Sequence, residues 1–217
     1  MTTKVKICGL KEELTLEAAL AGGADYVGFV FFAPSPRSLA PAAARPLVTC
    51  ARRGGAKVVA LLVDPDDGLL EEVVNAVEPD ILQLHGRESP ARAAQIGRRW
   101  RRQVMKAISV AAPGDAEAAL RYAGAADLIL FDAKAPTGAT RPGGNGQAFP
   151  WGLLAEVKDK VAYMLSGGLS PDNVAEAIRA TAAPIVDVSS GVESRPGEKD
   201  PALIARFLQI AKAAHPS

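Results

Sequence analysis

The chain has 217 residues, of which 48% are apolar and 23% charged, and its formal net charge is +1. This balance is typical of a globular protein with one sizeable core. It argues against a strongly basic face, so we expect neither nucleic acid nor an anionic membrane as a partner. Two cysteines are too few for a disulfide framework, and no apolar stretch reaches membrane-spanning length. We therefore expect a reduced, cytoplasmic protein that forms one domain over residues 1–217.

Apolar, β-rich runs alternate with helical runs along almost the whole chain. The predicted strands are Val5–Cys8, Tyr26–Phe32, Lys57–Val63, Ile81–His85, Val104–Ser109, Leu128–Asp132, Tyr163–Ser166 and Ile185–Ser189. The predicted helices are Glu12–Ala21, Ala42–Arg53, Leu69–Val77, Pro90–Trp100, Asp115–Tyr122, Pro150–Val157, Asp172–Ala180 and Pro201–Ala213. Val58–Val63 is apolar throughout, as expected of a parallel strand that is buried on both faces. Because parallel strands need crossover helices, the pattern predicts a closed (β/α)8 barrel, a TIM barrel, rather than an open doubly wound sheet.

Prolines mark several of the predicted helix ends. Ser170 and Asp200 each precede a proline, and this pairing is typical of the first turn of a helix. We therefore expect a helix to begin next to each of these two residues. Pro46 lies inside the second predicted helix, where its ring should kink the helix or delay its start.

Catalytic groups of a barrel come from the loops that follow its strands, and two of these loops stand out. Residues 33–38, after the second strand, contain two prolines and display Arg37. Residues 134–149, after the sixth strand, are rich in glycine and proline. A loop this long in a compact barrel is usually a lid or a binding loop.

Small residues follow the seventh and eighth predicted strands, at Gly167–Gly168 and at Ser190–Gly191. Such loops leave backbone N–H groups open to an anion, and the N-terminus of a following helix favours negative charge. Because barrels often bind phosphate after strands seven and eight, we expect a phosphorylated metabolite as the ligand. The alternative is that these glycines only form tight turns.

Cys8 and Asp132 end the first and sixth predicted strands and are the candidates for proton transfer. Asp132 follows four apolar residues, and burial would favour the protonated form that a general acid needs. Cys8 has Lys6 and Lys11 as cationic neighbours in sequence and could act as a base, although an inert buried thiol is the alternative. Cys50, on a predicted helix, is assigned no chemistry.

Other polar residues end the predicted strands or lie within them. His85 ends the fourth strand and is either structural or part of the site. Asp187 lies inside the eighth strand, where a carboxylate needs a partner, so a polar contact near the ligand is expected. Asp64, Asp66 and Asp67 could suggest a metal, but they also start a helix well, and no second ligand cluster completes a site. We therefore expect no metal.

Several strings of residues stand in a fixed order along the chain. They are Lys6–Leu10, Asp25–Phe31 with Ser35–Ser38, Leu82–Gly86, Phe131–Lys134, Gly143–Gly146, Ser166–Leu169 and Val186–Glu193. In this order they resemble the phosphoribosylanthranilate isomerase family of tryptophan biosynthesis, and the resemblance spans essentially the whole chain. It departs in the sixth loop, where Asn145 replaces the usual threonine, Pro150 replaces the usual aspartate, and residues 134–142 make the loop longer than in many members.

The resemblance implies an Amadori rearrangement of N-(5-phosphoribosyl)anthranilate to 1-(2-carboxyphenylamino)-1-deoxyribulose 5-phosphate. Carried over by position, it implies Cys8 as the general base and Asp132 as the general acid. Because the amine of the substrate supplies the electron sink, no cofactor is needed. Cys8 must be at least partly thiolate, so we expect nearby cations or substrate charge to lower its pKa.

The same resemblance implies the contacts with the substrate. Arg37 would hold the anthranilate carboxylate, and the loops at Gly167–Gly168 and Ser190–Gly191 would hold the phosphate. The further candidates for the substrate pocket are His85, Asp187 and Gly144.

Two other functions stay open at this point. A Schiff-base aldolase for sugar phosphates would use Lys134 or Lys106 as its nucleophile. A binding or regulatory barrel would take a phosphorylated metabolite without turnover, and the fold alone does not separate these functions. We expect the chain to act as a monomer or a homodimer.

Overall fold

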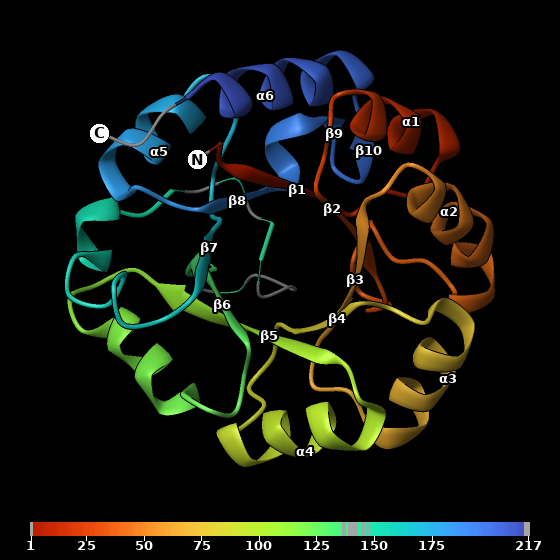
Figure 1. The fold of residues 1–217 in the computed structure, drawn as a ribbon, viewed down its shortest axis with the longest axis horizontal. Helices are drawn as coiled ribbons and strands as arrows, with labels where there is room; N and C mark the ends of the chain where they lie inside the picture. The colour runs from red at the N-terminus through yellow and green to blue at the C-terminus, as the bar shows by residue number, and fades with distance from the viewer. Residues whose placement is uncertain (1, 136–137, 139–142, 145, 147, 215–217) are drawn as a thin grey trace.

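The computed structural model describes residues 2–135, 138, 143–144, 146 and 148–214. Eight parallel strands close into a barrel in the order β1 to β8, and helices surround it (Figure 1). The strands are β1 Lys4–Cys8, β2 Tyr26–Val30, β3 Lys57–Leu62, β4 Ile81–Leu84, β5 Gln103–Val110, β6 Leu128–Ala133, β7 Tyr163–Leu165 and β8 Ile185–Val188. The predicted (β/α)8 barrel is confirmed.

The segments between the strands are α-helical, 3-10 helical or irregular. The α-helices are α1 Glu13–Ala21, α2 Pro41–Arg53, α3 Asp67–Val77, α4 Pro90–Trp100, α5 Val174–Thr181 and α6 Pro201–Ala213. The 3-10 helices are η1 Asp115–Tyr122, η2 Trp151–Leu154 and η3 Ser190–Val192, and β9 Glu193–Arg195 pairs with β10 Glu198–Lys199 in a small antiparallel ribbon. The last of these elements lie on the carboxyl side of β8 and bring their side chains to the site described below.

The interior of the barrel has an apolar layer and a polar layer. Alternate side chains of a strand point to the same face. The apolar layer consists of Tyr26, Val59, Ile81, Met105, Ala107, Leu130 and Met164. Two residues after Ile81, Gln83 points the same way, and Lys6 and Asp187 occupy matching positions on β1 and β8. All three polar side chains are buried, so polar groups line the barrel toward the carboxyl ends of its strands.

Aspartates at the amino ends of three strands tie neighbouring strands together. The carboxylate of Asp25 accepts a hydrogen bond from the N–H of Val5 at 2.8 Å. Asp80 does the same for Val58 at 2.7 Å, and Asp127 for Val104 at 2.8 Å. These contacts lie at the end of the barrel opposite the carboxyl ends of the strands, where the residues of a barrel serve stability rather than chemistry.

Local side-chain hydrogen bonds correct one predicted helix start and confirm another. The predicted start of a helix at Asp172 is wrong, because Ser170 Oγ accepts from the N–H of Asp172 at 3.2 Å and Asn173 Oδ1 accepts from the N–H of Ser170 at 2.8 Å. This turn delays α5 to Val174. Asp200, by contrast, caps α6 as predicted, since its carboxylate accepts from the N–H groups of the first turn.

The fifth and sixth predicted helices and the second one also differ from expectation. Residues 115–122 form the 3-10 helix η1, and of 150–157 only Trp151–Leu154 is regular. Helix α2 runs from Pro41 through Pro46 to Arg53, so the predicted delay at Pro46 is wrong. Pro41 suits the first helical position, which fixes the start of the helix before Pro46 is reached.

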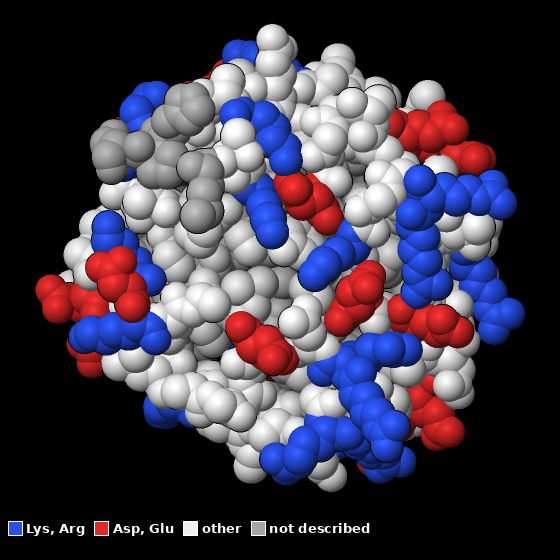
Figure 2. All heavy atoms as spheres, viewed as in Figure 1, with Lys and Arg blue, Asp and Glu red and all other residues white. Residues whose placement is uncertain are grey.

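Basic and acidic side chains are interspersed on the face shown in Figure 2, and basic groups gather most densely beside α4. The last turn of α4 carries Arg98 and Arg99, where cations meet the negative end of the helix dipole. Among the helices of the described residues, none combines the length and apolar character needed to cross a bilayer.

Candidate active site

An open pocket lies at the carboxyl ends of the strands, with a volume of about 770 Å³ that includes its part open to solvent. The predicted site residues that line it are Cys8, Arg37, His85, Asp132, Gly144, Gly167, Gly168, Asp187 and Ser190. The fold thus brings together groups that are spread over almost the whole sequence. Gly191 is the predicted residue that does not line the pocket.

Gly191 serves the packing of the eighth loop against the seventh. A Cβ at this position would lie 1.9 Å from the carbonyl oxygen of Leu169, so a larger residue would force the two loops apart. Its predicted contact with phosphate stays a prediction. Asn145 and residues 136–137 and 139–142 of the sixth loop lie outside the described residues.

The loop after β7 presents open backbone donors. Gly167 and Gly168 have φ angles of +89° and +62°, a region that favours glycine. Within the described residues, their N–H groups donate to no protein acceptor. A Cβ at Gly167 would lie 2.5 Å from the backbone nitrogen of Ala133, so this loop packs tightly on the end of β6. Adjacent N–H groups of this kind form a site for an anion such as phosphate.

Cys8 is buried at the end of β1, beside a glycine of β2. Gly28 is its register partner, and a Cβ there would lie 2.9 Å from Cys8 Sγ and 3.2 Å from Lys6 Cε. Glycine at position 28 therefore makes room for the thiol and the lysine. The signal in the sequence was a glycine inside an otherwise apolar strand, which often marks a close approach.

A buried ion pair lies next to the thiol. Lys6 Nζ is 2.8 Å from Asp187 Oδ1, and Ser166 Oγ donates to Asp187 Oδ2 at 3.0 Å. Asp187 thus has the partner that its burial requires. Burial opposes the charged form of Lys6, but the attraction of Asp187 and Cys8 outweighs it and raises the pKa of the ammonium.

The sequence predicts that nearby cations or substrate charge lower the pKa of Cys8. In the protein without substrate, this prediction is wrong. Burial raises the pKa of the Cys8 thiol, and the attraction of Lys6 offsets this only in part, while Asp187 adds repulsion. Lys11, the other cationic neighbour in sequence, donates instead to the carbonyl oxygen of Pro36 at 3.0 Å. The sequence correctly identified Lys6 as a cationic neighbour of Cys8, but it did not show how deeply the thiol is buried.

Asp132 is buried on β6 and hydrogen-bonded at both oxygens. Its Oδ1 accepts from the N–H of Ala133 at 2.9 Å, and its Oδ2 is 3.2 Å from His85 Nε2. A Cβ at Gly143 would lie 2.6 Å from Asp132 Oδ2 and 2.7 Å from His85 Nε2. The backbone at Gly143 therefore packs directly against this contact.

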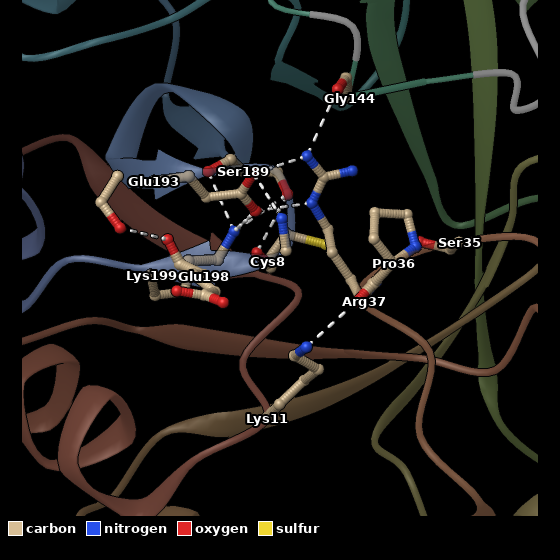
Figure 3. A network of polar contacts seen from close by, with 12 residues as sticks. Cys8, Lys11, Ser35, Pro36, Arg37, Gly144, Ser189, Glu193, Glu198 and Lys199 are labelled. Atoms are coloured by element: carbon tan, nitrogen blue, oxygen red, sulfur yellow. Dashed lines mark hydrogen bonds and ion pairs between the residues drawn. The ribbon is translucent and has the colours of Figure 1, made fainter.

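Arg37 is buried rather than displayed on its loop, with 4% of its surface exposed. Its Nε and Nη2 donate to the Glu193 carboxylate at 2.6 and 2.8 Å, and Nη2 also donates to the Gly144 carbonyl at 3.3 Å (Figure 3). Lys199 Nζ reaches the same carboxylate at 2.6 Å. Burial alone would raise the pKa of Glu193, but hydrogen bonds from Arg37 and the charge of Lys199 lower it to about 2.

One nitrogen of the Arg37 guanidinium, Nη1, takes no part in these contacts. Within the described residues, no hydrogen bond is formed by Nη1, and Figure 3 shows this nitrogen apart from the Glu193 contacts. A Cβ at Gly144 would lie 2.6 Å from Nη1 and one at Gly9 2.7 Å from Cδ. Two glycines thus fit around a guanidinium that is locked in place, which suits recognition of a carboxylate.

The other titratable candidates lie outside the pocket or have structural partners. Lys106 points away from the barrel interior, because its neighbours Met105 and Ala107 belong to the apolar layer. Its ammonium pairs with Glu88 at 2.9 Å and donates to two backbone carbonyls. This leaves Lys106 poorly placed for a Schiff base, whereas Lys134 lines the pocket.

The aspartates after β3 have helix-related roles. Asp66 accepts from the N–H of Leu69 at 2.8 Å and caps α3, and Asp67 pairs with Arg92 at 2.7 Å. Among the described residues, no group of three or more His, Cys, Asp or Glu side chains is arranged to hold a metal ion.

Sequence reasoning missed four polar residues that shape the site, namely Lys199, Glu193, Gln83 and Ser166. Glu193 and Arg37 are 156 positions apart, so no local pattern joins them. Gln83 had a usable signal, because a glutamine two residues before a strand-ending histidine must point to the same face.

The fold is that of an α/β barrel, and its candidate active site combines a thiol, a carboxyl group and backbone N–H groups suited to an anionic ligand. The sequence matches the family model described as N-(5'phosphoribosyl)anthranilate (PRA) isomerase over residues 5–210. The chain belongs to the N-(5′-phosphoribosyl)anthranilate isomerase family.

Individual relatives agree with this assignment over nearly their full length. The chain is 55% identical to N-(5′-phosphoribosyl)anthranilate isomerase of Rhodopseudomonas palustris, covering 98% of this chain and 97% of that protein. It is similar to the solved structure of phosphoribosyl anthranilate isomerase from Thermotoga maritima, with 36% identity, a TM-score of 0.87 and coverage of 97% and 98%. A second such structure, in complex with reduced 1-(o-carboxyphenylamino)-1-deoxyribulose 5-phosphate, has 34% identity, a TM-score of 0.84 and coverage of 97% and 98%. The predicted family and fold class are confirmed.

Proposed function

We propose that this chain isomerises N-(5′-phosphoribosyl)anthranilate to 1-(2-carboxyphenylamino)-1-deoxyribulose 5-phosphate in tryptophan biosynthesis, with Cys8 as base and Asp132 as acid. The observation that carries the assignment of roles is the shared pocket. A thiol from β1 and a carboxyl group from β6 face one cavity. They lie between Arg37, which can bind a carboxylate, and the N–H groups of Gly167 and Gly168, which can bind a phosphate.

The binding groups fit the two ends of the substrate. Nη1 of Arg37 would hold the anthranilate carboxylate, and the N–H groups after β7 and near Ser190 would hold the phosphate. Fixing both ends would leave the ribose between Cys8 and Asp132. Positioning of this kind makes a large contribution to the rate of a reaction within one molecule.

The proposed reaction moves protons and electron pairs within the substrate and leaves its composition unchanged. Asp132 donates a proton to the ring oxygen as the C1–O bond breaks, while the nitrogen lone pair forms the C1=N bond. The Cys8 thiolate then takes the C2 hydrogen, and the C–H electrons form a C1=C2 bond as the C=N electrons return to nitrogen. The Cys8 thiol then returns its proton to C1 of the enolamine, and the C2 hydroxyl gives its proton to the Asp132 carboxylate as it becomes the ketone. The substrate nitrogen serves as the electron sink throughout.

Lys6 supports the ionisation that this mechanism demands of Cys8. Its ammonium interacts with the thiol and with Asp187, so the positive charge next to sulfur favours the thiolate. Burial holds the pKa of Cys8 above its ordinary value, so more of the thiol ionises as the pH rises. The value of kcat/KM is therefore expected to rise with pH through the neutral range.

The function is tested by generating N-(5′-phosphoribosyl)anthranilate in situ and following the loss of its anthranilate-type fluorescence. We expect conversion without any added metal or cofactor. Borohydride trapping with a sugar phosphate distinguishes the aldolase, because an adduct on Lys134 would contradict the isomerase mechanism. Saturable binding without conversion would instead support a non-catalytic barrel.

The oligomeric state forms a separate part of the proposal. We expect a monomer or a homodimer, since all the groups proposed for catalysis come from one chain. Light scattering of the purified protein measures this directly, and a higher assembly would contradict it.

A further inference from the structure

Gln83 lies fully buried on β4 and contacts the histidine that follows the strand. Its side chain is 0% exposed, and its Nε2 is 3.0 Å from His85 Nδ1. Its other polar atom, Oε1, has no hydrogen-bond partner among the described residues. Burying an amide whose oxygen has no hydrogen-bond partner costs free energy, so the position of Gln83 beside the site calls for an explanation.

The direction of this hydrogen bond fixes the tautomer of His85. An amide N–H can only donate, so Nδ1 accepts and the ring proton of neutral His85 sits on Nε2. The opposite orientation would turn Oε1 toward an Nδ1–H and leave the amide N–H donors without a partner. Buried N–H groups without partners are rarer than buried carbonyl oxygens without partners, which favours the observed arrangement.

The fixed tautomer aims a donor at the acid. His85 Nε2 is 3.2 Å from Asp132 Oδ2, and the N–H of Ala133 donates to Oδ1 at 2.9 Å. Both carboxyl oxygens therefore receive a hydrogen bond, which stabilises the carboxylate form. The backbone at Gly143 packs against the contact, since a Cβ there would lie 2.6 Å from Asp132 Oδ2 and 2.7 Å from His85 Nε2.

We propose that Gln83 is a positioning residue: its amide fixes the Nε2–H tautomer of His85, which stabilises the carboxylate that Asp132 becomes after giving up its proton. The inference rests on the function proposed above for its kinetic consequence, but the tautomer itself is a property of the protein alone. Gln83 acts on the reaction through His85 and Asp132 and not by holding either end of the substrate.

The tautomer is measured by NMR of protein labelled with ¹⁵N-histidine. The chain contains two histidines, His85 and His215, so a His215→Ala variant assigns the spectrum. We expect His85 to show a pyridine-type Nδ1 and a pyrrole-type Nε2 at neutral pH. In Gln83→Glu the carboxylate accepts instead of donating, so the proton should move to Nδ1 or the ring should become doubly protonated. A pyrrole-type Nδ1 in the unmodified chain would overturn the proposal even if the protein is a fully active isomerase.

Kinetics then test whether the tautomer matters for turnover. Gln83→Glu should lower kcat by about 10- to 100-fold, the scale of a hydrogen bond to a charged group, with little change in KM. His85→Asn should cause a similar loss. Adding Gln83→Glu to His85→Asn should then cost little more, because Gln83 acts through the histidine.

A fully multiplicative loss in the double variant would overturn the positioning role, since it would mean that Gln83 acts independently of His85. A Gln83→Glu change that raises KM alone would also overturn it, by showing a direct contact with substrate. If the unmodified chain shows no isomerase activity, the proposed function fails while the NMR result on the tautomer still stands. The two failures are therefore distinguishable.

Discussion

The buried lysine beside Cys8 gives a prediction that joins stability to chemistry. Lys6 is 0% exposed and its ammonium is 2.8 Å from Asp187 Oδ1. Lys6→Met keeps the length of the side chain but leaves a buried carboxylate without its partner. Breaking a buried pair in this way costs about 3–5 kcal/mol. At about 2–4 °C per kcal/mol for a chain of this size, the Tm should fall by about 6–20 °C.

The matched control removes both charges. Lys6→Met combined with Asp187→Leu leaves neither ion buried alone, and replacing a buried pair by apolar groups is often nearly neutral. The Tm of the double variant should therefore lie well above that of Lys6→Met. If the double variant were the less stable of the two, the cost assigned to the lone carboxylate would be refuted.

The same substitution tests the effect of Lys6 on the thiol. Because the Lys6 ammonium lowers the pKa of Cys8 against the effect of burial, its loss should raise that pKa further. The assay is the pH dependence of iodoacetamide alkylation in a Cys50→Ser background, which leaves Cys8 as the only thiol. The rate at a given pH should fall in Lys6→Met. A Tm within about 3 °C of the unmodified chain, together with an unchanged alkylation profile, would refute the reasoning.

Three further substitutions test the pocket. Arg37→Ala should raise KM far more than it lowers kcat, because the lost contact is to the substrate carboxylate and not to a reacting atom. Gly28→Ala should lower kcat at least about tenfold in a folded protein, on the scale of misplaced catalytic groups, since its Cβ would lie 2.9 Å from Cys8 Sγ. Glu193→Gln should flatten the acid side of the stability profile: with a pKa of about 2 against an ordinary 4.5, Glu193 contributes stability above pH 4.5 that is lost as the pH falls toward 2.

Each of these three predictions has an outcome that would contradict it. Unchanged kcat and KM in Arg37→Ala would remove the carboxylate contact. Normal turnover in Gly28→Ala would show that the thiol tolerates displacement. For Glu193→Gln, urea unfolding between pH 2 and 6 is compared with the unmodified chain, and identical acid destabilisation would exclude this carboxylate as a source of it.

The barrel and the positions of Cys8 and Asp132 could be predicted because both follow from periodicity. Parallel strands meet with their carboxyl ends on one side, so residues that end different strands must share a pocket. The glycines after β7 were predictable for the same reason. The sequence does not show which groups compensate the charges in the pocket.

The contacts that the sequence missed depend on side chains that meet through the closed barrel. Lys6 faces Asp187 only because β1 pairs with β8, and Glu193 reaches Arg37 from the ribbon after β8. The prediction for the Cys8 pKa failed for a related reason: a neighbouring lysine is visible in the sequence, but the burial that opposes it is not. The start of α5 was missed because the side chain of Asn173 stabilises a turn that competes with the helix.

Turnover of N-(5′-phosphoribosyl)anthranilate by Cys8→Ser and Asp132→Asn, measured beside the unmodified chain, tests the roles of base and acid most directly. Both variants should fold, as judged by an unchanged circular dichroism spectrum, and each should lose at least about 10²-fold in kcat, the usual scale for proton-transfer groups. Turnover close to that of the unmodified chain in either variant would contradict the role proposed for that residue.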